Sequence, residues 1–313
     1  MKPCLLQIGG FPSFIQEMID AEFDCVQWED IAGDASRRAQ VRGIVTRSNF
    51  LIEAERMRQL PELGIIATCG VGYDGIPLAL AREKGILVAN TPDVLNAAVA
   101  ELTIGLVLGL LRRLPQADRF LRASHWLEGA FPLGTSLEGK RVGIIGMGRI
   151  GKEIARRLVP FDVALAYHGR RDQGLATRFE PDLRALAQAS DILIVAAPGG
   201  AQTAGMVDAA VLDALGPQGV IVNIARGSII DEQALVAALS QGRIGGAALD
   251  VFHDEPRVDA RLMGLDNVVL TPHIGSATHE TRRRMAELTL ENLRLYFREG
   301  RVITPVVLPE QSG

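Results

Sequence analysis

The sequence contains few cysteines, and their spacing indicates no structural role for them. Three cysteines, Cys4, Cys25 and Cys69, stand in a chain of 313 residues, and no two of them have the C-x-x-C spacing. An odd number at irregular spacing excludes a disulfide framework and a zinc ribbon, and we predict no metal site. Unpaired thiols are typical of a reducing compartment, so we expect a cytoplasmic protein.

The sequence also lacks a long apolar segment and a surplus of positive charge. Its longest apolar stretch, residues 102–111, has ten residues, whereas a membrane-spanning helix needs about 20. Lysines and arginines number 33 against 37 aspartates and glutamates, which gives a net charge of −4. A nucleic-acid-binding protein would carry a basic surplus. We therefore expect neither a membrane nor a nucleic acid as a partner.

Aromatic residues make up only 5% of the chain, whereas hydrophobic residues make up 48%. The core must therefore be mostly aliphatic, and the length predicts two domains at about 100–200 residues each. Short β-branched runs alternate with helical patterns, which predicts two α/β domains of the Rossmann-like or flavodoxin-like kind, with parallel sheets. The strands predicted for the first domain are residues 5–8, 43–46, 65–68 and 87–89. Those predicted for the second are residues 142–145, 163–167, 192–196, 220–224, 246–249 and 268–271.

Two longer helical stretches, residues 94–114 and 279–299, lie outside this alternation. We interpret the first as the passage from the first domain into the second, and the second as the passage back. The first domain is then discontinuous and comprises residues 1–98 plus 284–313. The second domain comprises residues 99–283.

Gly146, Gly148 and Gly151 form a G-x-G-x-x-G motif between the predicted strand 142–145 and a predicted helix at 150–158. The first glycine permits a tight turn, the second lets the backbone approach a pyrophosphate, and the third lets helix and strand pack closely. The helix N-terminus then faces the negative charge. The second domain is therefore predicted to bind a dinucleotide, which leaves the first as the substrate domain.

The residues after the next predicted strand indicate which dinucleotide binds. An NAD site has an acidic residue about 20 positions beyond the glycines, which binds the ribose 2′-OH. Here the segment HGRR at 168–171 supplies Arg170 and Arg171, and the nearest acid, Asp172, follows them. A guanidinium binds a 2′-phosphate bidentately, whereas a carboxylate repels it. We predict NADP(H) as the preferred cofactor, with NAD(H) possible; the alternative is that both arginines are solvated loop charges.

Ionisable residues follow three predicted strands of the second domain. They are Arg226, Glu255 and His273, and ligands of open α/β sheets bind beyond the carboxyl ends of strands. Hydride addition to a carbonyl builds negative charge on oxygen, which an arginine can stabilise. A histidine can supply the proton, and a carboxylate stabilises the protonated imidazole. The set suits ketone reduction, although each residue alone has an ordinary structural explanation, and His253 stays a rival proton donor.

The order of these motifs resembles the D-isomer-specific 2-hydroxyacid dehydrogenase family. The matching segments are GVGYDGI at 70–76, NTPDVLNAAVAELTIGLVL at 90–108, GMGRIG at 146–151, NIARGSIIDEQAL at 223–235, GAALDVFHDEP at 246–256 and LTPHIGSAT at 270–278. The HGRR segment makes the chain resemble most the branch of NADPH-dependent glyoxylate/hydroxypyruvate and hydroxyphenylpyruvate reductases. The segment at 197–205 departs from the family pattern. This departure affects only the contacts expected with the adenosine side of the cofactor.

The resemblance implies a role for each matching residue. Arg226 would bind the substrate carboxylate and keto oxygen, His273 would donate the proton, and Glu255 would be its charge partner. Backbone N–H groups of Val71 and Gly72 would hold the carboxylate. The cofactor contacts that it implies, together with those predicted above, come from Thr103, Gly146, Gly148, Arg149, Ile150, Gly151, Gly169, Arg170, Arg171, Pro198, Thr203, Ile224, Asp250 and Gly275.

The resemblance further implies reduction of a 2-keto acid of the glyoxylate or hydroxypyruvate type to the D-2-hydroxy acid, in an interdomain cleft of a homodimer. An arylpyruvate or 2-ketogluconate substrate is an alternative. A nucleotide-sensing corepressor is an alternative from a different class, and a formate- or phosphite-type dehydrogenase is a third. Pocket size depends on residues 47–50 and Tyr73, while Trp126, Phe131 and Leu133 either reach a partner subunit's site or pack at an interface.

Overall fold

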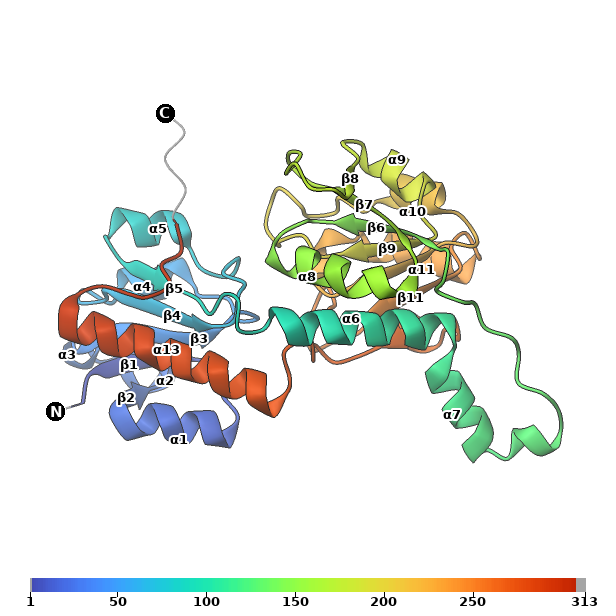
Figure 1. The fold of residues 1–313 in the computed structure, drawn as a ribbon. Helices are drawn as coiled ribbons and strands as arrows, with labels where there is room; N and C mark the ends of the chain where they lie inside the picture. Colours follow the sequence, from blue (N-terminus) through green and yellow to red (C-terminus); the bar gives the residue numbers. More distant parts are fainter. Residues whose placement is uncertain (1, 308–313) are drawn as a thin grey trace. The chain divides into compact units, whose positions relative to one another are not determined.

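The computed structural model describes residues 2–307, which form two α/β units (Figure 1). One unit contains the chain up to Leu95 and from Thr278 on, and the other is Asn96–Ala277. Helices α6 (Asn96–Leu111) and α13 (His279–Glu299) each belong wholly to one unit. The expected boundaries after residues 98 and 283 fall inside these continuous helices, and the division lies just before each of them.

The first unit has a five-stranded sheet with the order β2-β1-β3-β4-β5, in which all pairs are parallel. Its strands are β1 (Cys4–Ile8), β2 (Asp24–Val26), β3 (Val41–Arg47), β4 (Ile65–Cys69) and β5 (Leu87–Ala89). Its helices are α1 (Ser13–Glu22), α2 (Trp28–Ile31), α3 (Ala35–Arg38), α4 (Ala54–Arg58), α5 (Leu78–Glu83) and α13.

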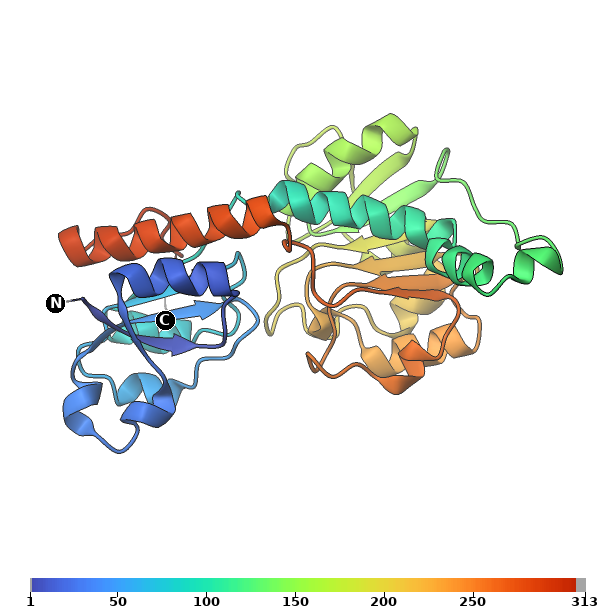
Figure 2. The same cartoon turned by 90° about the horizontal axis from the view of Figure 1, so that it is seen from below.

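Both faces of this sheet are buried, which explains why its strands are apolar runs without polar alternation. The neighbours Leu5 and Leu6 point to opposite faces of β1. Leu5 packs with residues of α1 and α13, whereas Leu6 packs with residues of α4 and α5. Figure 2 shows α1 and α13 together on one side of the sheet.

The second unit has a seven-stranded parallel sheet with the order β12-β11-β10-β9-β6-β7-β8. Its strands are β6 (Arg141–Ile145), β7 (Ala164–His168), β8 (Arg178–Phe179), β9 (Ile192–Val195), β10 (Val220–Asn223), β11 (Gly246–Leu249) and β12 (Val268–Leu270). Its α-helices are α6, α7 (Leu114–Arg122), α8 (Arg149–Leu158), α9 (Leu183–Gln188), α10 (Ala209–Leu215), α11 (Glu232–Ser240) and α12 (Ala260–Met263). The strand order reverses between β6 and β9, and ligands bind at such a switch point.

Helices cover both faces of the second sheet, as they do in the first. Helices α6 and α8 pack together on one face, and α9, α10 and α11 contribute to the core on the other. The predicted fold class of parallel α/β domains is therefore confirmed. Within the described residues, the longest helices are too short or too polar to cross a bilayer.

The first long helical stretch is shorter than predicted. The prediction ran from 94 to 114, but α6 ends at Leu111, and Arg113 adopts a left-handed conformation with φ 54°. Helix α7 then begins at Leu114 with a proline in its first turn, a position that tolerates the missing N–H of proline. The segment that follows, with the 3-10 turn η1 (His125–Leu127), extends away from the sheet of its unit (Figure 2).

Candidate active site

The glycine-rich turn joins β6 to α8 as the sequence predicts. Gly146 has φ +96°, and a Cβ there would lie 2.6 Å from the Cα of Ala197. A Cβ on Gly151 would collide with the carbonyl oxygen of Gly146, whereas one on Gly148 would meet no described atom within 4 Å. Two glycines are thus required by close packing and the third leaves open space at the N-terminus of α8. The turn fits a dinucleotide pyrophosphate.

The loop after β7 carries the two arginines of the expected adenosine side. Arg170 and Arg171 are exposed and line a pocket of about 850 Å³ together with Asp172 and Gln173. Within residues 2–307, neither guanidinium has a carboxylate partner. Unpaired guanidinium groups beside a pocket suit a phosphate.

Other expected cofactor residues lie in the loops that follow β9 and β10. Pro198 is exposed, and its carbonyl oxygen accepts a 2.7 Å hydrogen bond from the Thr203 hydroxyl. Ile224 is buried, and its N–H donates to the carbonyl of Val195. Both loops therefore start at the same edge of the sheet as the glycine-rich turn.

His273 and Glu255 form a pair. His273 Nδ1 lies 2.7 Å from Glu255 Oε2, and the two side chains are 29% and 23% exposed. The second oxygen of Glu255 accepts the backbone N–H of Phe252 at 3.1 Å, and the Glu255–Pro256 peptide is cis. The rival, His253, is exposed on the same loop. Since Glu255 binds Nδ1 of His273, Nε2 is left as the nitrogen that can exchange a proton with a ligand.

Glu255 is a carboxylate near neutral pH. Burial raises its pKa, but the hydrogen bond and charge of His273, the Phe252 N–H and the positive charge of Arg226 outweigh burial and lower it. The structure thus places His273 and Glu255 in direct contact, and the role predicted for each of the three residues stays a prediction.

Arg226 follows β10 in a loop that its neighbours hold tightly. The side chain of Asn223 donates to the carbonyl of Arg226 at 2.9 Å and accepts the N–H of Ala225 at 3.0 Å. A Cβ on Gly227 would collide with the carbonyl of Phe252, so the Arg226 loop packs directly on the loop that carries Glu255. Sequence reasoning missed Asn223 and Gly227, although both stand in the NIARG segment.

Asp250 fixes the turn that presents His273. Its buried carboxylate accepts hydrogen bonds from the Thr271 hydroxyl at 2.6 Å and from the N–H groups of Ile274 and Gly275 at 2.8 Å each. Burial raises the pKa of Asp250 against the effect of these hydrogen bonds, which lower it. The three donors bracket His273, whose backbone is left-handed with φ 52°. Sequence reasoning expected a cofactor contact from Asp250 and missed this clamp.

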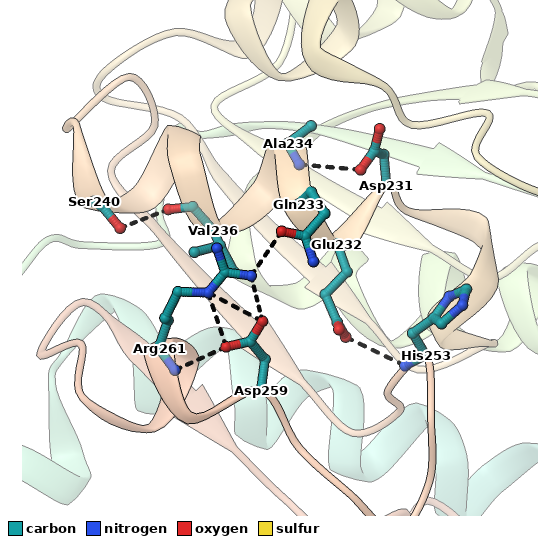
Figure 3. Close-up of polar contacts among 9 residues, drawn as sticks. All are labelled: Asp231, Glu232, Gln233, Ala234, Val236, Ser240, His253, Asp259 and Arg261. Atoms are coloured by element: carbon teal, nitrogen blue, oxygen red, sulfur yellow. Dashed lines mark hydrogen bonds and ion pairs between the residues drawn. The ribbon is translucent and has the colours of Figure 1, made fainter.

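The loop between β11 and α12 is also fastened to α11 (Figure 3). Glu232, at the start of α11, accepts the backbone N–H of His253 at 3.3 Å. Arg261 donates to Gln233 at 2.7 Å and to Asp259 at 2.6 Å. Both ends of the loop are therefore held against one helix, which limits the movement of the Glu255 carboxylate between them.

Two groups of expected residues lie apart from this arrangement in sequence. Val71 and Gly72 follow β4 of the first unit, where the side chain of Asn90 donates to the carbonyl of Val71 at 2.8 Å. Thr103 is fully buried in α6, and its hydroxyl donates to the carbonyl of Val99 at 2.7 Å. The Thr103 side chain is therefore held inside its own helix, and the expected cofactor contact stays a prediction.

Two parallel α/β units, a glycine-rich turn at a switch point and an Arg–Glu–His group at strand ends define a dinucleotide-dependent oxidoreductase. Residues 104–275 match the sequence model of the D-isomer specific 2-hydroxyacid dehydrogenase, NAD binding domain. The chain belongs to the D-isomer specific 2-hydroxyacid dehydrogenase family, as its motifs suggest.

Relatives match nearly the whole chain. It is 48% identical to glyoxylate/hydroxypyruvate reductase A of Arabidopsis thaliana over 97% of this chain and 98% of that protein. It is 46% identical to hydroxyphenylpyruvate reductase of Plectranthus scutellarioides, with the same coverage. A crystal structure of NADPH-dependent glyoxylate/hydroxypyruvate reductase from Sinorhizobium meliloti, in complex with NADP and malonate, superposes with a TM-score of 0.92. That protein is 44% identical, and the match covers 98% of this chain and 97% of the other.

Proposed function

We propose that this protein catalyses the NADPH-dependent reduction of a small 2-keto acid, of the glyoxylate or hydroxypyruvate type, to the D-2-hydroxy acid. The observation that carries the proposal is the 2.7 Å pair of His273 and Glu255, on a loop against which the Arg226 loop packs. The Arabidopsis and Sinorhizobium relatives, which are named as glyoxylate/hydroxypyruvate reductases, support the substrate class.

The three catalytic residues would divide the reaction among them. The guanidinium of Arg226 would bind the substrate carboxylate and stabilise the negative charge that develops on the keto oxygen. Glu255 would hold Nδ1 of His273, so that Nε2 delivers a proton to that oxygen. Backbone N–H groups of Val71 and Gly72 would bind the carboxylate. The nicotinamide of the bound cofactor supplies the hydride.

NADPH is proposed over NADH because of the exposed arginines that follow β7. Arg170 and Arg171 would bind the 2′-phosphate, and the glycine-rich turn would bind the pyrophosphate. The NADP in the Sinorhizobium reductase supports this preference. Further proposed cofactor contacts come from Gly146, Gly148, Arg149, Ile150, Gly151, Gly169, Pro198, Thr203, Ile224, Asp250 and Gly275.

A substrate and cofactor panel tests the proposal. We would measure kcat/KM for glyoxylate, hydroxypyruvate, 4-hydroxyphenylpyruvate and 2-ketogluconate, each with NADPH and with NADH. We expect the highest value for glyoxylate or hydroxypyruvate with NADPH, and loss of the NADPH preference in the variant Arg170→Ser/Arg171→Ser. The highest value for the aryl or sugar acid would contradict the substrate class. Tight nucleotide binding without any turnover would indicate a nucleotide sensor instead.

We also propose a homodimer, because the segment around α7 and η1 exposes large apolar side chains. Leu121 is 57% exposed, Trp126 68%, Leu127 90% and Leu133 96%. Exposed apolar groups gathered on one segment mark an association surface. The test is light scattering coupled to gel filtration, in which Leu127→Asp/Leu133→Asp should convert a dimer into a monomer. A monomeric parent protein would contradict the proposal.

A cytoplasmic location is proposed from the thiols. Cys4, Cys25 and Cys69 are all free. Burial, followed by the charges of nearby carboxylates, raises the pKa of Cys25 to about 12. This thiol therefore stays protonated at neutral pH, and the reactive thiolate does not form. Free thiols persist in a reducing compartment. Localisation of a tagged chain by fluorescence microscopy would test this.

A further inference from the structure

We infer that Tyr167 is a positioning residue for the 2′-phosphate site, because its buried hydroxyl holds Asp172 and the loop that presents Arg170 and Arg171. The inference rests on NADPH as the cofactor, as proposed above. It assigns the discrimination between NADPH and NADH to a buried hydroxyl as well as to the two exposed arginines.

The loop contains charges of both signs beside one pocket. Arg170, Arg171, Asp172 and Gln173 all line it. The hydrogen bond from Tyr167 and the N–H of Gly174 hold the pKa of Asp172 below its usual range, so this carboxylate is negative at neutral pH. Asp172 already lines the pocket, and a carboxylate that moved closer to a bound 2′-phosphate would repel it more strongly. The direction in which Asp172 points therefore matters for cofactor choice.

Tyr167 sets that direction. The residue is fully buried near the edge of the sheet, where its ring packs on Phe179 with 5.3 Å between centroids. Its hydroxyl donates to Asp172 Oδ1 at 2.7 Å and accepts the N–H of Gln173 at 2.8 Å. The N–H of Gly174 donates to the same Asp172 oxygen at 2.9 Å. The Asp172 carboxylate is thus bound to a hydroxyl whose ring is fixed in the buried core.

The same loop is tied to the pyrophosphate turn. The side-chain amide of Gln173 donates to the carbonyl of Met147 at 2.8 Å, and Met147 lies between the first two glycines of the G-x-G-x-x-G motif. Tyr167 fixes the backbone of Gln173, so the hydroxyl also supports this bridge. The loop with the arginines is therefore anchored at two points, one in β7 and one in the glycine-rich turn.

Removal of the hydroxyl should act on phosphate recognition and spare the rest of the cofactor. In Tyr167→Phe the ring remains in the core, while Asp172 loses the hydroxyl donor and keeps only the N–H of Gly174. The carboxylate is then held less firmly and can move toward a bound phosphate. The affinity for a 2′-phosphate should fall about tenfold, which is the order expected for the repulsion of one like charge near the protein surface. A ligand without the 2′-phosphate gains no charge repulsion and should bind as it does to the parent protein.

The test is isothermal titration calorimetry with 2′,5′-ADP and with 5′-AMP, which reports binding without turnover. In Tyr167→Phe we expect the ratio of the two Kd values to shift about tenfold toward 5′-AMP, with the Kd of 5′-AMP changed less than about twofold. The matched control is Tyr296→Phe, which removes a hydroxyl in α13 of the first unit and should leave both Kd values unchanged. The variant Asp172→Asn keeps an acceptor for the hydroxyl but lacks the charge, and should bind 2′,5′-ADP at least as tightly as the parent.

The combination Tyr167→Phe/Asp172→Asn separates steering of the charge from general damage. If Tyr167 acts by directing Asp172, most of the loss in Tyr167→Phe should disappear when the carboxylate is absent. An equal loss in both backgrounds, an equal weakening of 5′-AMP and 2′,5′-ADP, or an unchanged ratio in Tyr167→Phe would each overturn the inference. Should Tyr167→Phe fail to fold, Gln173→Ala, at an exposed position, must shift the ratio in the same direction or the inference is wrong.

The parent protein distinguishes this inference from the proposed function. If it binds 2′,5′-ADP no more tightly than 5′-AMP, the NADPH assignment fails and the inference fails with it. If the parent protein prefers 2′,5′-ADP but Tyr167→Phe keeps that preference in full, the cofactor assignment stands and the positioning role alone is overturned.

Discussion

The substitution Glu255→Gln changes the charge of the histidine partner and preserves its shape. In the parent protein, His273 Nδ1 and Glu255 Oε2 are 2.7 Å apart, a length typical of a charge-assisted hydrogen bond. Such bonds contribute about 1.5–3 kcal/mol, whereas bonds between neutral groups contribute about 0.5–1.5 kcal/mol. The difference is about 1–1.5 kcal/mol, and because both side chains are partly exposed the lower end applies.

A loss of about 1 kcal/mol in the transition state corresponds to a kcat about fivefold lower. We would measure kcat and KM for hydroxypyruvate at saturating NADPH by the absorbance of the cofactor. The matched control is Asp254→Asn, since Asp254 is the adjacent carboxylate but pairs with the exposed Arg257 at 2.8 Å. It should keep the parent kcat. If Glu255→Gln also keeps the parent kcat, His273 does not depend on its carboxylate partner, and the reasoning is refuted.

Three further outcomes follow from the same site. His273→Ala should lower kcat by about 100-fold or more, since a general acid is lost. The Kd for NADPH, measured by fluorescence titration, should stay near the parent value. A variant that keeps its activity would assign the proton donor to His253 instead. Gly227→Ala should lower both the melting temperature and kcat, because its Cβ would collide with the Phe252 carbonyl; a parent-like melting curve would show that the loops yield easily. The pKa of Glu255 is lowered from its ordinary value of 4.5, so its contribution to stability is complete above 4.5 and is lost as pH falls through the lower folded-state value. The difference in melting temperature between the parent and Glu255→Gln should therefore shrink in acid. A difference that grows in acid would show that the pKa of Glu255 is raised on folding and contradict this prediction.

The pattern of apolar runs was sufficient to predict the strands that lie inside the sheets. Runs buried on both faces have a clear signature in the sequence. The short edge strands β2 and β8 were not predicted, because strands of two or three residues with polar or charged members carry no such signature. The break at Arg113 was missed for a similar reason, since a left-handed arginine leaves no trace in composition, although the following proline was a usable signal.

The positions of the candidate residues after strands were predictable because parallel strands deliver their carboxyl ends to one edge. Arg226, Glu255 and His273 could be grouped from their positions after strands alone. The supporting contacts could not be predicted in this way. The clamp by Asp250 and the hydroxyl of Tyr167 depend on which oxygen meets which donor across loops, and no spacing in the sequence encodes that.

The left-handed backbone of His273 makes one residue important for both stability and activity. A non-glycine residue with φ 52° costs about 1–2 kcal/mol relative to a relaxed conformation, and the Asp250 clamp offsets this expense. A glycine at 273 would relieve this strain, but it would also remove the side chain that pairs with Glu255 and that we propose as the proton donor. Stability and turnover therefore depend on different properties of this one residue, and a screen for improved variants must score turnover alongside resistance to heat.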